Sequence, residues 1–160
     1  ENSILASNIP LLQETTMTQQ TNVPKPIPVP SHESSFYWDK CKQQELWVRK
    51  CNECDRTYFY PRDLCPNCFS RNTEWIKCSG RGTLHTFGIV ARPPHRGWAE
   101  DVPYVVCMVD LEEGCRMPSN LVNIEIDLSN PGKSIWVGMD VQVVWDQRGD
   151  DMVIPVFSPS

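Results

Sequence analysis

The second half of the chain is built from short apolar runs that end at breaks containing glycine or proline. These runs occupy residues 74–78, 82–91, 104–111, 116–125, and 140–146 with 153–157. Apolar runs of this length between turn formers are typical of β-strands. About five strands in some 85 residues fit a small Greek-key barrel of the oligonucleotide/oligosaccharide-binding (OB) type better than a sandwich. The predicted fold class is therefore mainly β.

A different pattern precedes these strands. Ser34 or Ser35 can cap a short helix that starts at Phe36 and runs towards Leu46. Residues 46–50 then predict a strand, and residues 57–61 predict a β-rich return that ends at a turn. The expected order is an N-terminal helix, a hairpin-like ribbon and the barrel.

The head of the chain has the composition of an arm. Residues 1–35 contain no aromatic side chain, so all 15 aromatic residues lie further along the chain. Four of the five prolines in the head alternate with other residues between Pro24 and Pro30. Alternating proline gives a stiff, extended segment that cannot build its own core. The arm is either a disordered tail or a strap laid across a partner.

These patterns divide the chain into three regions. We predict a disordered or extended proline-rich arm over residues 1–32, the helix and ribbon over residues 33–73, and the barrel over residues 74–160. Met17 resembles a native start, so residues 1–16 are interpreted as vector-derived sequence. No apolar run approaches the roughly 18 residues of a membrane span, and no basic segment precedes an apolar one at the N-terminus. A cytoplasmic protein is expected.

The eight cysteines carry the clearest chemical signal. Four of them form two C-x2-C pairs, Cys51 with Cys54 and Cys65 with Cys68, ten residues apart. Two such knuckles supply four thiolates in a tetrahedron, which soft metal ions prefer. Two disulfides or free thiols are the alternatives, but a disulfide scaffold seldom repeats this spacing. We expect a closed, structural, rubredoxin-like zinc site, with iron as the less favoured metal.

Charge divides the chain in two. Residues 40–81 carry nine Lys or Arg against five Asp or Glu, a formal +4, and residues 82–160 carry five against eleven, a formal −6. The sequence therefore places a basic ribbon on an acidic barrel. The basic surface is either a solvated face that offsets the thiolates or a face for an acidic partner or a phosphorylated cofactor. The net charge of −5 disfavours nonspecific binding to a phosphate backbone.

A set of ordered motifs resembles one known family. The segments are Phe36–Trp38, Cys51–Cys54, Pro61, Cys65–Cys68, Gly80–Gly82, Pro103–Val106, Asn120–Val122 and Pro155–Phe157. In this order they look like the acyl-CoA-associated zinc-ribbon/OB-fold family, catalogued as domain of unknown function thirty-five. The resemblance covers residues 33–158, which is essentially everything except the head.

The resemblance implies a role as the small accessory subunit of a thiolase-like protein. Such complexes make or break carbon–carbon bonds in CoA thioesters, as thiolases, acyltransferases or retro-aldolases. A hetero-oligomer that shares a CoA thioester with its partner is implied. The family usually has glycine after each knuckle, where this chain has Asp55 and Phe69. Because Phe tolerates a left-handed backbone less well than Asp, we expect the second knuckle to differ in shape.

No nucleophile and base stand at a recognisable catalytic spacing. The cysteines outside the pairs at positions 78, 107 and 115 lie in strand-like sequence, and none of the three histidines is spaced to serve them. Cys107 lies in an apolar strand and is expected to be a buried small hydrophobe. His85 is expected to be partly buried and structural. The chain alone is therefore expected to be non-catalytic.

The longest break between strands, residues 92–103, is the candidate contact surface. It is either an ordinary connection with one Trp tucked into the core or a binding loop, because binding residues gather on loops held by a rigid barrel. The resemblance places this region towards the partner and its CoA substrate. The candidate CoA or partner contacts are Arg81, Arg92, His95, Arg96 and Trp98.

Two other functions fit parts of the pattern. A single-stranded nucleic-acid module can combine a ribbon with an OB barrel, but it needs basic residues among the aromatics of a barrel that carries −6 here. A rubredoxin-like electron carrier would use the four cysteines for iron and would leave the barrel unexplained.

Overall fold

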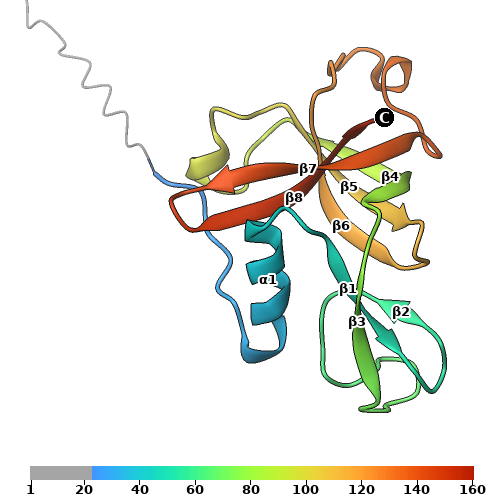
Figure 1. Ribbon diagram of the computed structural model, residues 1–160. Helices are drawn as coiled ribbons and strands as arrows, with labels where there is room; N and C mark the ends of the chain where they lie inside the picture. Colours follow the sequence, from blue (N-terminus) through green and yellow to red (C-terminus); the bar gives the residue numbers. More distant parts are fainter. Residues whose placement is uncertain (1–22) are drawn as a thin grey trace, which may run out of the picture.

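The computed structural model describes residues 23–160. The interpretation of Met17 as the start, of residues 1–16 as vector-derived, and of the arm before residue 23 lies outside the described residues. In chain order the elements are η1 (His32–Ser34), α1 (Ser35–Lys42), β1 (Trp47–Cys51), β2 (Thr57–Tyr58), β3 (Thr73–Lys77), β4 (Arg81–Val90), η2 (Arg96–Trp98), β5 (Tyr104–Leu111), β6 (Arg116–Leu121), η3 (Pro131–Lys133), β7 (Asp140–Arg148) and β8 (Met152–Pro159). Figure 1 shows a barrel with a ribbon beneath it and α1 beside both. Within the described part, no helix has the length and apolar character needed to cross a membrane.

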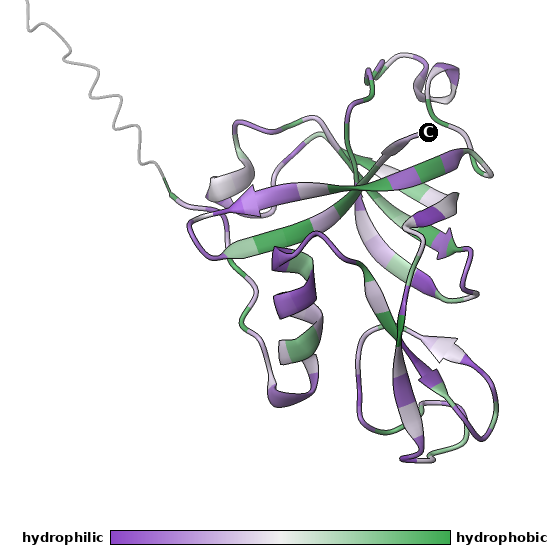
Figure 2. Ribbon diagram, viewed as in Figure 1, coloured by the Kyte–Doolittle hydropathy of each residue, from purple (hydrophilic) through white to green (hydrophobic). Residues whose placement is uncertain are grey.

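Five strands close the barrel in the order β4–β5–β6–β8–β7, with β7 pairing back to β4. The pairing of β6 with β8, at Leu121 and Phe157, is parallel, and the other pairs are antiparallel. Leu84, Val105 and Val109 are fully buried inside the barrel, as alternation along a half-buried strand requires. Figure 2 shows the hydrophobic stretches concentrated in the barrel strands and a largely hydrophilic ribbon. The predicted mainly-β fold with an OB-type barrel is confirmed.

The ribbon is a three-stranded sheet in the order β2–β1–β3. The sequence pattern groups residues 74–78 with the barrel strands, and this grouping is wrong. β3 pairs with β1 along its whole length, from Trp47 opposite Lys77 to Cys51 opposite Thr73. The reason is geometric. β3 follows the second cysteine pair, and there the chain runs back alongside β1, the strand that leads into the first cysteine pair.

The helix α1 forms as predicted but ends earlier than Leu46. Gln44 adopts a left-handed backbone with φ of 58°, and this turns the chain towards β1. Tyr37 and Trp38 are buried on the inner face of α1, which packs against β8. The Trp38 indole donates a hydrogen bond to the Tyr60 hydroxyl at 3.0 Å, so the helix is also fixed to the ribbon.

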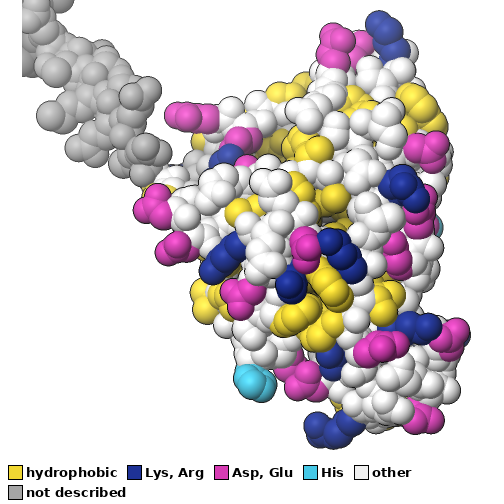
Figure 3. Space-filling model, in the orientation of Figure 1, with side chains coloured by type: hydrophobic (Ala, Val, Ile, Leu, Met, Phe, Trp, Pro, Cys, Tyr) yellow, Lys and Arg dark blue, Asp and Glu magenta, His cyan; other side chains and the backbone are white. Residues whose placement is uncertain are grey.

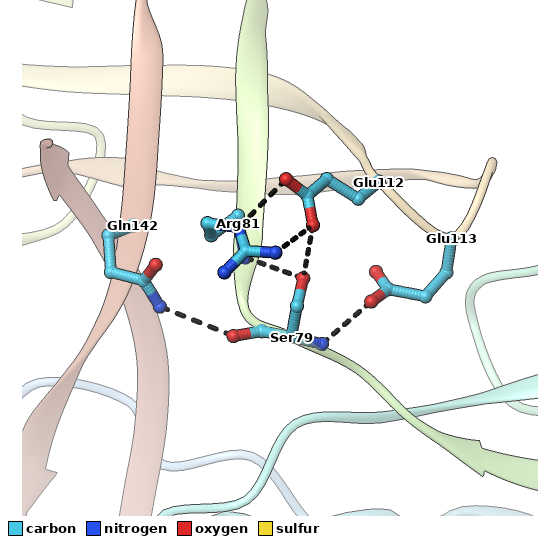
Figure 4. Close-up of polar contacts among 5 residues, drawn as sticks. All are labelled: Ser79, Arg81, Glu112, Glu113 and Gln142. Carbon is cyan, nitrogen blue, oxygen red and sulfur yellow. Dashed lines mark hydrogen bonds and ion pairs between the residues drawn. The ribbon is translucent and has the colours of Figure 1, made fainter.

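A polar cluster fixes the ribbon on the barrel where the chain passes from one to the other (Figure 4). The Ser79 amide donates to a Glu113 carboxylate oxygen at 2.6 Å, and Arg81 makes a two-point contact with Glu112 at 2.8 and 2.9 Å. The Arg81 hydrogen bond lowers the pKa of Glu112. Gly80, between Ser79 and Arg81, has φ of 78°, and a Cβ on this residue would lie 2.4 Å from a Val143 methyl group. Only glycine fits this linker.

Candidate functional site

The four paired cysteines meet at the tip of the ribbon. Cys51 is the last residue of β1 and Cys54 lies in the turn that follows, while Cys65 and Cys68 lie in the connection before β3. Their four Sγ atoms lie within 4.8 Å of one another. Two of the sulfur–sulfur distances are 3.5 Å, between Cys51 and Cys68, and 3.7 Å, between Cys54 and Cys65. The sulfurs of a tetrahedral zinc site with bonds near 2.3 Å are separated by about 3.8 Å. The residues therefore fit zinc.

The two knuckles share one backbone shape. Asp55 and Phe69 have φ of 58° and 60°. The Cys51 amide donates to the Arg56 carbonyl, two residues after Cys54, and the Cys65 amide donates to the Ser70 carbonyl, two residues after Cys68, both at 2.9 Å. Both acceptor carbonyls therefore occupy the same position relative to their knuckle. The expectation that the second knuckle differs in shape from the first is wrong. The Phe69 ring is 71% exposed, so it meets no packed neighbour that would prevent the left-handed turn.

The electrostatics of the cluster favour a bound cation. The Arg56 amide donates to Cys54 and, against the effect of desolvation, lowers the pKa of that thiol to about 6. At Cys68 the Ser70 amide lowers the pKa, but desolvation and the three neighbouring thiols outweigh it and raise the pKa to about 12. Four thiols this close cannot all ionise unless a positive charge lies between them. With four sulfur ligands the site is closed, which is the arrangement of structural zinc.

The loop from Arg92 to Pro103 holds four of the predicted contact residues. His95 caps the short helix η2, because its Nδ1 accepts a hydrogen bond from the Gly97 amide at 3.1 Å. Trp98 is half-buried and stacks on Tyr104 with ring centroids 5.1 Å apart. Arg92, His95 and Arg96 are exposed, and none of them forms an ion pair with another described residue. The loop thus presents two free cations beside a fixed aromatic ring.

Arg81 does not join this loop. It lies at the start of β4, and Arg92 lies just beyond the end of the same strand, about 36 Å away along an extended chain. Its guanidinium is paired with Glu112. The structure therefore brings Arg92, His95, Arg96 and Trp98 together and leaves Arg81 at the other end of the barrel.

A groove of about 610 Å³ crosses the outer face of the barrel where α1 and the ribbon meet it. Its walls come from three parts of the chain and include Trp38, Tyr60, Val106 and Met108. Val106 and Tyr60 are 41% and 39% exposed. The strands β5 and β6 beneath it form the face that OB folds use for ligands.

The remaining cysteines and histidines form no nucleophile–base pair among the described residues. Cys107 is 6% exposed, which confirms the expected buried hydrophobe, and burial raises its pKa to about 11. His85 is not partly buried as expected, because its side chain is 42% exposed and its Nδ1 lies 3.0 Å from Asp110 Oδ2. A β-bulge between Leu84 and Thr86 re-aims the side chain to the outside.

Sequence reasoning missed two surface features. The connection between β6 and β7 contains three large apolar side chains that are more than half exposed, Leu128, Trp136 and Val137. Large apolar residues in a segment that also contains the turn formers Asn130 and Pro131 could have indicated this exposed surface. Hydrophobic side chains also gather between α1 and the ribbon, bordered by Lys and Arg (Figure 3). There Phe36 stacks on Trp75 with ring centroids 4.6 Å apart.

The closed five-strand barrel and the four-sulfur tip define the chain as a zinc-ribbon/OB-fold protein whose four clustered cysteines fit a structural zinc ion. The family profile described as “ChsH2, rubredoxin-like zinc ribbon domain” matches residues 38–74, and “ChsH2, C-terminal OB-fold domain” matches residues 75–146. The chain belongs to the DUF35 family that these ChsH2 domains represent, and the resemblance in its motifs is confirmed.

Several relatives are described by function. The chain is 30% identical to a “Probable enoyl-CoA hydratase alpha subunit” of Thermomonospora curvata over 89% of its own length, and it spans 42% of that relative. It is 34% identical to a “DUF35 domain-containing scaffold protein” of Methanocaldococcus jannaschii, over 73% of this chain and 82% of the relative. The solved structure “Ltp2-ChsH2(DUF35) aldolase” matches with a TM-score of 0.69 and 30% identity, over 83% of this chain and 98% of the other.

Proposed function

We propose that this chain is the non-catalytic accessory subunit of an acyl-CoA enzyme that makes or cleaves a carbon–carbon bond. In this proposal a thiolase-like partner supplies the catalytic residues, and the two proteins share a CoA thioester. The observation that carries the proposal is the match of ribbon and barrel together to a chain in the aldolase named for Ltp2 and ChsH2. The hydratase alpha subunit among the relatives also points to CoA thioesters.

The chemistry of the described residues supports a non-catalytic role. A metal held by four cysteines has no open position for water or substrate. Burial raises the pKa of Cys41 to about 12 and that of Cys115 to about 11, so these thiols stay protonated near neutral pH. In this proposal the chain binds the partner protein and positions the CoA thioester.

Two surfaces suit a CoA thioester. The exposed cations Arg92 and Arg96 fit its phosphate groups, because the charge and fork geometry of a guanidinium match a phosphate. The groove beside Val106 is apolar, and its volume of about 610 Å³ lies in the usual range for ligand sites. We assign the phosphates to the loop and the apolar part of the thioester to the groove.

Co-expression of this chain with a thiolase-like protein from the same organism tests the proposal. We expect the two proteins to co-elute in size-exclusion chromatography and acyl-CoA turnover to require both. Replacing Cys78, Cys107 and Cys115 together by Ser or Ala in a folded chain should leave turnover of the complex within a few-fold. Turnover by the isolated chain, lost on changing one of these cysteines, would overturn the proposal.

A further inference from the structure

The described part of the proline arm lies on its own barrel. Lys25 Nζ lies 2.6 Å from Asp101 Oδ1, across 76 residues of sequence. The same ammonium group lies 5.0 Å from the centroid of the Trp98 ring, and the guanidinium carbon of Arg148 lies 4.6 Å from it. Tyr104 stacks on the same ring, so the Trp98 side chain is held by the arm, by β5 and by β7.

The fit between arm and loop is close. A Cβ on Gly97 would lie 2.7 Å from the Pro24 carbonyl oxygen and 3.0 Å from Lys25 Cα, so the arm occupies the space that any larger residue would need. Two residues further on, Ile27 reaches the β7–β8 turn, where its Cδ1 would lie 3.3 Å from a Cβ on Gly149. Figure 1 shows the arm running from the loop that carries η2 past the β7–β8 hairpin to α1.

The arm is anchored at both ends of its described part. At its end nearer α1, the Ser31 amide donates to Ser34 Oγ at 2.9 Å, and Ser34 is fully buried. At the other end, Asp101 Oδ2 is buried and has no hydrogen-bond partner within residues 23–160. The Asp101 carboxylate therefore depends on Lys25 for its neutralisation. Between the anchors, alternating proline keeps the chain extended at little entropic cost.

We propose that the arm is an intramolecular strap and that Lys25 is a positioning residue, which holds the Arg92–Pro103 loop in one conformation through Asp101 and Trp98. Lys25 also withdraws Asp101 from the loop cations, so Arg92 and Arg96 stay free for an anionic group. This last consequence rests on the proposed function, whereas the fixing of the loop does not.

Hydrogen exchange of the full chain, followed by mass spectrometry over residues 92–103, tests the strap. We expect exchange at least tenfold faster in Lys25→Met and in Gly97→Ala, which lifts the arm without touching the charge. Lys25→Arg should stay within about threefold of the parent, because Arg keeps both the ion pair and the contact with the ring. The matched control is Lys133→Met, an exposed lysine without a described ion pair. Unchanged exchange in both Lys25→Met and Gly97→Ala would overturn the strap.

A second measurement separates the strap from the proposed function. In the assembled complex, we expect Lys25→Met to raise the KM for acyl-CoA several-fold with kcat within twofold, and Lys25→Arg to restore KM. Faster exchange with an unchanged KM would uphold the strap and contradict the assignment of CoA phosphates to the loop. Unchanged exchange would contradict the strap whatever the value of KM.

Discussion

Phe69 holds a backbone conformation that costs an L-residue free energy. Its φ of 60° lies in the left-handed region, and its ring is 71% exposed. Glycine adopts this conformation without the steric penalty, at the cost of greater freedom in the unfolded chain. We therefore expect Phe69→Gly to stabilise the zinc-loaded ribbon by about 0.5–1 kcal/mol. The measurement is the free energy of unfolding in denaturant at fixed zinc concentration.

Asp55 is the matched position in the first knuckle. Asp tolerates the left-handed region better than Phe, and its carboxylate lies 2.7 Å from Lys50 Nζ. Asp55→Gly should therefore change stability less than Phe69→Gly. A loss of stability in Phe69→Gly would contradict the account of strain at the second knuckle.

The cysteines outside the metal site should be unreactive in the folded protein. Desolvation raises the pKa of Cys41 to about 12 and those of Cys107 and Cys115 to about 11, and it also raises the pKa of Cys78. The thiolate is the reactive form, so iodoacetamide at pH 8 should label these four at least a hundredfold more slowly than a free thiol. Mass spectrometry of the zinc-loaded protein provides the rates, and the unfolded protein with a chelator is the control. Rapid labelling of any one of the four would contradict their burial.

At the scale of elements, the sequence predicts what is local. The four-cysteine cluster follows from the spacing of its members. Ser34 does stand at the N-cap position of α1, but its side chain makes no capping hydrogen bond there, so the expected role of Ser34 as a side-chain cap is wrong. The sheet that β3 joins could not be predicted, because a strand of five residues fits either neighbouring sheet and only the return of the chain from the second knuckle decides. The contact of Lys25 with Asp101 was equally hidden, since ion pairing across 76 residues leaves no periodic pattern.

The Arg92–Pro103 loop allows its two proposed roles to be separated by substitution. Trp98 is held by Tyr104, Lys25 and Arg148, so Trp98→Ala should free the loop and weaken assembly with the partner by roughly 2 kcal/mol or more. Arg96 is exposed and unpaired among the described residues, so Arg96→Ala should raise the KM for acyl-CoA while assembly stays intact. Titration calorimetry and steady-state kinetics of the complex measure the two effects. If neither variant changes assembly or kinetics, the loop is only a barrel connection.

At the scale of the whole molecule, residues 23–160 form one large core and one very small one. The large core joins the barrel to α1 and to the base of the ribbon, with Tyr37 and Val48 among its members. The small core at the ribbon tip contains only Cys51, Tyr58 and Cys65 as buried residues. Because so little apolar surface is buried at the tip, we expect its folding to depend on a metal bound by the four cysteines.

Loss of one ligand should therefore unfold the tip and spare the barrel. We expect Cys65→Ser to reduce zinc from one equivalent to less than half an equivalent by elemental analysis. Structural zinc contributes on the order of 10–16 kcal/mol of apparent binding free energy in small fingers, and the tip has no other source of comparable size. Amide exchange should become fast between residues 51 and 72, while β5 and β6 remain protected. Cys107→Ser, also buried but not a ligand, should keep its zinc. A Cys65→Ser chain with full zinc and a protected tip would contradict the assignment of the metal site, because a closed four-sulfur centre cannot lose a ligand without consequence.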